Sequence, residues 1–202
     1  MTFLELNEFS DVAASLKLLR VSLQDSVHST IYWKPCILHS HSALQGACVC
    51  ILTNTDGTGA LAKSSEKELM NKLYGESGAG RNLDDGALEW PEDFIASLPE
   101  LLKRLPNGLQ VRLPEKKERP YPLNTEGDLR RLHEFRNMLV HFPPGSWNLK
   151  LSRLPRIISE SVSAIERIVT SPDYPRRNRF PETRAQEELI CIQTLLRTME
   201  TK

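Results

Sequence analysis

Residues 129–147, LRRLHEFRNMLVHFPPGSW, are the stretch from which the fold of this chain is best predicted. On a helix that turns about 100° per residue, their side chains divide into an apolar and a polar face. The apolar face is wide enough to pack against a core and consists of Leu132, Phe135, Met138, Leu139 and Phe142. The polar face lies within an arc of about 100° and consists of Arg130, His133, Glu134, Asn137 and His141. The stretch therefore predicts an amphipathic helix over about residues 125–142.

Three polar residues near the end of this helix are candidates for chemistry. The sequence PPG at 143–145 ends the helix, because proline lacks an N–H and disfavours the helical conformation in the preceding residue. His141 therefore lies in the last turn, where the helix dipole favours a positive charge and suits a proton donor. Arg136, at the border between the faces, carries donors shaped for phosphate oxygens, and Asn137 is suited to orient a neighbouring side chain or a ligand. The alternative interpretation is the solvated polar face that most surface helices carry.

The composition bounds the class of protein. A chain of 202 residues fits one domain with a full core. The 26 lysines and arginines balance the 26 aspartates and glutamates, so affinity for nucleic acid has to come from a local patch. Four cysteines without a secretory leader indicate a reduced protein, and no apolar stretch approaches the ~20 residues of a membrane span. We expect a soluble, cytoplasmic protein with no membrane partner.

Apolar residues at helical spacing predict further helices on both sides of the motif helix. The expected ranges are 9–26, 31–52, 64–74, 90–105, 154–170 and 182–199. The helix at 154–170 has the clearest apolar stripe, which runs through Ile157, Ile158, Val162 (or Ser161), Ile165, Ile168 and Val169. Almost no stretch alternates between apolar and polar residues. We therefore expect an all-α fold, with residues 1–202 forming a single bundle of five or six helices.

The starts of three helices carry candidate capping residues. Ser10 is expected to cap the first helix, and Ser65 with Glu68 resembles a capping box for the third. Thr125 and Asp128 are expected to cap the motif helix in the same way. The buried stripe of the first helix is expected to comprise Val12, Leu16, Leu19, Leu23 and Val27.

Two connections were considered for function. The proline- and charge-rich segment 108–124 is expected to stay outside the core. Its Lys116, Lys117 and Arg119 either assist RNA binding or belong to a solvated loop. The glycine-rich segment 75–86 lacks the GK[ST] ending of a phosphate-binding P-loop, so a plain connection is the favoured interpretation.

A cluster of cysteines and histidines in the second helix invites a metal interpretation: Cys36, His39, His41, Cys48 and Cys50. Their spacings do not match those of structural zinc sites. Cys48 and Cys50 would also point about 200° apart on a helix, so they do not share one ion there. We interpret the cysteines as small core residues, and we expect neither a metal nor a cofactor.

The segment RNMLVH, Arg136-Asn137-x-x-x-His141, resembles the signature of the HEPN superfamily of small α-helical proteins. That signature is an arginine, usually with a polar neighbour, followed by a histidine after four to six intervening residues. The apolar helix before the motif and the long helix after it are also similar. The resemblance covers most of the chain as a fold, which would make it one HEPN-like domain, but only Arg136, Asn137 and His141 match as functional residues.

Helix geometry sets a condition on any site built from these residues. Arg136 and His141 point about 140° apart on a regular helix, so one helix can hardly apply both to the same phosphate. Two copies related by a twofold axis bring the same patch against itself. The resemblance implies the same arrangement, a homodimer with a composite site.

The resemblance also implies an activity, metal-independent cleavage of RNA in a toxin–antitoxin or phage-defence system, with an antitoxin or another protein as a further partner. His141 would transfer protons to and from the RNA, Arg136 would stabilise charge on the phosphate, and Asn137 would orient the histidine or the substrate. One departure is that Phe142 and Pro143 follow His141, where HEPN toxins neutralised by nucleotidyl transfer carry a tyrosine two residues beyond the histidine. This counts against that particular pairing with an antitoxin.

Two other interpretations stay open at this stage. A non-catalytic HEPN-like module would use Arg136 and His141 to bind RNA or a partner protein. A helical adaptor would carry the motif by coincidence. His133, on the same face, is a further candidate that the family pattern does not support.

Overall fold

The computed structural model describes residues 7–53, 58–74, 94–141, 144, 148–174 and 182–200. Seven α-helices lie in these residues, which confirms the all-α class but exceeds the five or six helices expected. They are α1 (Glu8–Ser26), α2 (Trp33–Leu52), α3 (Lys63–Tyr74), α4 (Leu98–Arg104), α5 (Thr125–His141), α6 (Leu154–Val169) and α7 (Glu182–Glu200). Three short 3₁₀ turns accompany them: η1 (Thr30–Tyr32), η2 (Lys116–Glu118) and η3 (Leu151–Arg153).

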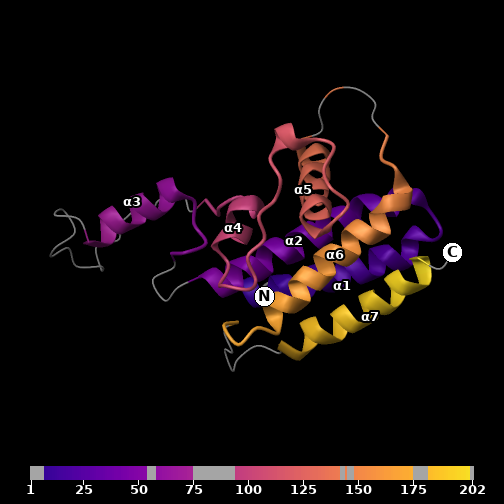
Figure 1. Ribbon diagram of the computed structural model, residues 1–202. Helices are drawn as coiled ribbons and strands as arrows, with labels where there is room; N and C mark the ends of the chain where they lie inside the picture. The colour runs from indigo at the N-terminus through magenta and orange to yellow at the C-terminus, as the bar shows by residue number, and fades with distance from the viewer. Residues whose placement is uncertain are drawn as a thin grey trace.

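The core of the fold lies among α1, α2, α6 and α7, which run alongside one another in Figure 1. α2 packs on α1 and on α6, while α7 covers α1 and α6 from the other side. α5 stands at a steep angle to these helices and packs on α2 and α6 (Figure 1). α3 lies apart from the bundle in the same view.

The apolar stripe of α6 is the one expected from the sequence, and α7 also buries residues at helical spacing. α6 (Leu154–Val169) matches the expected range of 154–170 to within one residue. Its buried positions include Ile157, Ile158, Ser161, Val162, Ile165 and Ile168. α7 buries Leu189, Ile192 and Leu196. An ion pair 2.6 Å long between Arg20 Nε and Glu188 Oε2 ties α7 to α1.

The start and the end of α1 differ from the expectation. Asn7, not Ser10, is the N-cap: its Oδ1 accepts from the Ser10 N–H, and Ser10 Oγ accepts from the Asn7 N–H. Ser10 therefore closes a capping box from inside the first turn. Val27 is 60% exposed because α1 ends at Ser26, so the helical spacing no longer directs this side chain to the core.

The region around residues 94–97 is extended where a helix was expected. Ile95 forms an antiparallel bridge with Leu61, and the Ala96 N–H donates to the Ala60 carbonyl over 2.9 Å. α4 consequently begins at Leu98, with a proline in its first turn. Ser65 caps nothing, because α3 already begins at Lys63; its Oγ accepts from the Phe94 N–H.

The segment between α4 and α5 packs into the core, contrary to its composition. Val111, Leu113 and Tyr121 are buried, and the first two join the main hydrophobic cluster. These buried apolar side chains anchor the connection, although most of its other residues are exposed. Residues 75–86, Phe142, Pro143 and Gly145 lie outside the described residues.

α2 is the most apolar of the long helices. Contrary to the expectation that no apolar stretch approaches the length of a membrane span, Thr30–Leu52 reaches that length and hydropathy, and half of its most apolar window is buried inside the fold. Its contacts with α1, α5 and α6 place this apolar helix in the core of the fold.

Candidate functional site

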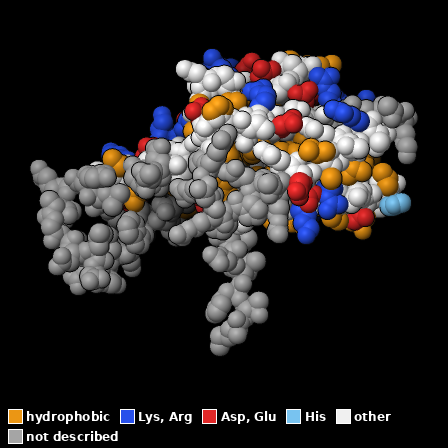
Figure 2. Space-filling view, turned by 90° about the horizontal axis from the view of Figure 1, so that it is seen from below, with side chains coloured by type: hydrophobic (Ala, Val, Ile, Leu, Met, Phe, Trp, Pro, Cys, Tyr) orange, Lys and Arg blue, Asp and Glu red, His pale blue; other side chains and the backbone are white. Residues whose placement is uncertain are grey.

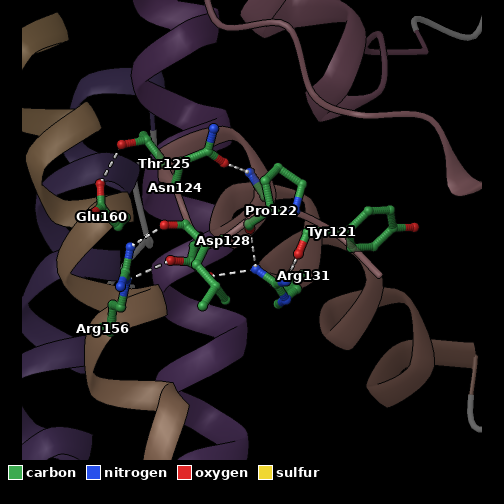
Figure 3. A network of polar contacts seen from close by, with 10 residues as sticks. Tyr121, Pro122, Asn124, Thr125, Asp128, Arg131, Arg156 and Glu160 are labelled. Atoms are coloured by element: carbon green, nitrogen blue, oxygen red, sulfur yellow. Dashed lines mark hydrogen bonds and ion pairs between the residues drawn. The ribbon is translucent and has the colours of Figure 1, made fainter. Parts of the chain in front are cut away.

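The N-terminal turn of α5 is fixed by a network of polar contacts that Figure 3 shows from close by. Asn124 caps the helix, because its Oδ1 accepts from the Gly127 N–H over 3.0 Å. Thr125, expected as the cap, instead donates through Oγ1 to Glu160 Oε2 of α6 over 2.7 Å. Asp128 was expected to complete the cap, but its carboxylate turns away from the helix end.

Asp128 is the centre of this network. Its carboxylate is completely buried and pairs with Arg131 Nη1 over 2.7 Å and with Arg156 Nε over 2.9 Å. Arg131 also donates to the carbonyls of Tyr121 and Pro122, and Arg156 donates to the Leu123 carbonyl (Figure 3). One buried carboxylate thereby holds α5, α6 and the end of the preceding segment together.

The polar face of α5 is half-buried, contrary to the interpretation as a solvated surface. His133 lies against His41 of α2, with 3.1 Å between His133 Nδ1 and His41 Nε2. The two rings are nearly parallel, with their centroids 5.4 Å apart. His41 is only 2% exposed. The two histidines therefore form part of the contact between α2 and α5.

Two of the three predicted site residues are in direct contact. Arg136 Nη1 donates to Asn137 Oδ1 over 3.0 Å. Asn137 Nδ2 lies 3.1 Å from His133 Nε2, so its amide faces the histidine pair. His141 is exposed in the last turn of α5, and no side-chain hydrogen bond joins it to Arg136, Asn137 or any other described residue. Within one chain, the structure brings together Arg136 and Asn137 but not His141.

Burial holds both histidines of the pair in the neutral form. It lowers the pKa of His133 to about 4, with help from the positive charges of Arg130 and Arg136 and against the opposing effect of Glu134. Burial likewise lowers the pKa of His41 to about 3, to which His133 and Arg136 contribute.

These pKa values predict that the fold loses stability in mild acid. Below pH 6.5 the unfolded chain binds protons at both positions, while the folded chain does so only near pH 4 and pH 3. The free energy of unfolding then falls with pH by up to about 1.4 kcal/mol per unit for His41 and by less for His133, which is more exposed to solvent. This contribution is complete above pH 6.5 and is lost as the pH falls toward 4.

This contribution is measured by urea unfolding at pH 7.5 and pH 4.5. The proteins compared are the wild type and the double variant His41→Gln/His133→Gln. Between pH 7.5 and pH 4.5, we expect the free energy of unfolding of the wild type to fall by at least about 2 kcal/mol more than that of the double variant. The pKa of His39 is also lowered by burial, but His39 is present in both proteins, so its effect cancels. Equal losses in the two proteins would contradict the prediction.

Two cations of the preceding segment pair with carboxylates. Lys117 Nζ pairs with Glu115 over 2.9 Å, and Arg119 contacts Glu134 of α5. On the face shown in Figure 2, basic and acidic side chains alternate among hydrophobic ones and form no continuous positive surface. A hollow of about 350 Å³ near α4 is lined in part by Lys103 and Arg112, but no α5 residue is among its described lining. Lys117 and Arg119 therefore add little free positive charge to the site.

The cysteine and histidine cluster of α2 does not gather around one point. Cys36, Cys48 and Cys50 are buried free thiols, and burial raises the pKa of Cys36 and of Cys50 to about 12. Such thiols act as small apolar side chains. Among the described residues, no group of three or more potential ligands is placed to hold a metal ion.

Comparisons of the chain with protein-family models, with curated proteins and with solved structures find no match.

The partner of His133 could not be predicted from the sequence. Both histidines were noted, His133 on the polar face of the motif helix and His41 in the cluster of α2, but they are 92 positions apart in the chain. One signal was present, because a histidine within a largely apolar core helix needs a polar partner. Which helix supplies that partner depends on the tertiary packing.

Proposed function

We propose that this protein is a metal-independent endoribonuclease of HEPN type that cleaves RNA at a composite site formed by two copies of the chain. The observation that carries the proposal is how Arg136 and His141 are placed on α5. His141 is exposed in the last helical turn, and Arg136 is held by Asn137 one turn earlier. The motif thus offers an accessible proton carrier together with a pre-oriented guanidinium.

The need for a second copy follows from the placement of the motif. Arg136 and His141 point in different directions on one helix, about 140° apart for a regular α-helix. An isologous dimer with α5 at its centre supplies one histidine on each side of a phosphate. In this proposal homodimerisation is a requirement for activity.

The reaction needs only side chains of this kind. A neutral His141 takes the proton of the ribose 2′-OH as that oxygen forms a bond to phosphorus. The bond from phosphorus to the 5′-oxygen breaks, and the protonated His141 of the other copy donates a proton to the leaving oxygen. The products are a 2′,3′-cyclic phosphate and a 5′-hydroxyl. Arg136 stabilises the negative charge on the pentacoordinate phosphate.

The test is cleavage of a mixed RNA pool in EDTA by purified protein. We expect cutting by the wild type and at least a ~100-fold lower rate in Arg136→Ala/His141→Ala, because proton transfer and charge stabilisation are both lost. The matched control is Arg112→Ala/His28→Ala, which removes an exposed arginine and an exposed histidine outside α5 and should cut at the wild-type rate. Cutting that persists in the α5 variant would contradict the proposal.

The alternative is a non-catalytic module that binds RNA or a partner protein through the same helix. The pairing of Lys117 and Arg119 with carboxylates favours a protein partner over RNA for such a module, because neither cation is then free to retain RNA. Folded, dimeric wild-type protein that binds RNA without cutting it would support this alternative. A place in a toxin–antitoxin or phage-defence system is a further part of the proposal and is carried by the resemblance alone.

A further inference from the structure

A continuous chain of polar contacts runs from the candidate site into the core. It begins at Arg136, passes through Asn137 and His133, and ends at the buried His41. The successive contacts are 3.0, 3.1 and 3.1 Å long. Three of the four residues belong to α5, and His41 belongs to α2. This series of polar contacts therefore links the proposed reactive face of α5 to the interface between α5 and α2.

The direction of every hydrogen bond in this series follows from its first residue, Arg136. A guanidinium has only donors, so Asn137 Oδ1 accepts from Arg136. The amide nitrogen of Asn137 then faces His133, and because it can only donate, His133 Nε2 must accept. A neutral imidazole that accepts at Nε2 carries its proton on Nδ1. His133 Nδ1 therefore donates to His41 Nε2, and His41 in turn carries its own proton on Nδ1.

We infer that His133 and His41 are positioning residues that lock the Asn137 amide, and through it the Arg136 guanidinium, in one orientation. A free Asn137 amide would rotate and present its nitrogen to Arg136, which would break that contact. The His133 acceptor prevents this rotation, and His41 fixes the tautomer that makes His133 an acceptor. The role in catalysis rests on the proposed ribonuclease, but the proton positions do not.

The proton positions can be observed directly. In ¹⁵N-labelled wild-type protein at pH 8, long-range ¹H–¹⁵N spectra should show His133 and His41 with protonated Nδ1 and unprotonated Nε2. Asn137→Asp replaces the amide donor with a carboxylate that only accepts. We expect His133 Nε2 to become protonated in that variant. A wild-type His133 protonated on Nε2, or no change in the variant, would overturn the inference.

A second pair of variants separates positioning from packing. His133→Gln keeps an acceptor for Asn137 and a donor for His41, whereas His133→Leu keeps neither. We expect His133→Gln to retain most of the cleavage rate at saturating RNA and His133→Leu to lose about 10-fold, with both variants folded and dimeric. Equal rates in the two variants would overturn the positioning role.

The two proposals fail in different ways. If the wild type cuts no RNA but shows the expected tautomers, the ribonuclease is wrong and the hydrogen-bond chain stands. If the wild type cuts RNA but its tautomers are reversed, the ribonuclease stands and the positioning role is wrong.

Discussion

Asp128→Ala is expected to lower the free energy of unfolding by about 3–5 kcal/mol. The substitution removes a completely buried carboxylate and leaves Arg131, whose side chain is 12% exposed, without its charged partner. Arg156 loses its partner as well, but its side chain is 47% exposed, so water replaces part of that contact. Most of the loss should therefore come from Arg131. Urea unfolding at pH 7.5 measures the change.

Glu160→Ala is the matched control for this prediction. It removes a carboxylate of the same region that accepts one hydrogen bond, from Thr125. Loss of one such partly buried bond costs about 1 kcal/mol. If Asp128→Ala costs no more than Glu160→Ala, the buried network is not what holds α5 in place.

Gly127→Ala is expected to destabilise the protein by about 2–3 kcal/mol, although helix propensity alone favours alanine by about 1 kcal/mol. An added Cβ would lie 2.0 Å from the Pro122 carbonyl oxygen. That oxygen belongs to the backbone and accepts a hydrogen bond from Arg131, so moving it also disturbs the contacts around Asp128. The steric cost therefore outweighs the gain in propensity. Thermal or urea unfolding of the variant measures the difference.

Gly108→Ala provides the comparison. Nothing lies within 4 Å of its added Cβ, and the cost comes only from a backbone φ of 88°. A left-handed backbone costs about 1–2 kcal/mol for a residue other than glycine. Stabilisation by Gly127→Ala would show that the helix start moves freely away from Pro122, which would contradict the prediction.

The parts of the fold that could be predicted are those set by local periodicity. α6 begins and ends within one residue of the range that its apolar stripe predicts. The buried residues of α1 and α7 likewise lie at helically spaced apolar positions. The errors lie where a distant partner overrides a local preference. Residues 94–97 are extended because they pair with residues 60–62. Asp128 resembles a cap in the sequence, but Arg156 of the next helix draws its carboxylate into the core.

The candidate site was predictable only as a list of residues. The sequence places Arg136, Asn137 and His141 on one helix, and the structure keeps them there. It does not indicate that Asn137 turns toward His133, whose own orientation depends on its contact with His41 of α2. Polar side chains at helical spacing look alike whether they face water or a buried partner. Only the packing of α5 on α2 separates the two cases.

The contact between α1 and α7 has a consequence for synthesis on the ribosome. Arg20 and Glu188 are 168 positions apart, and α7 covers an apolar face of α1. At typical elongation rates of 5–20 residues per second, that face of α1 stays uncovered for roughly 10–30 s before α7 is synthesised. During this interval the nascent chain carries an open hydrophobic surface of the kind that chaperones bind. The emergence of α7 from the ribosome is therefore the event that covers this face of α1 and ends its exposure.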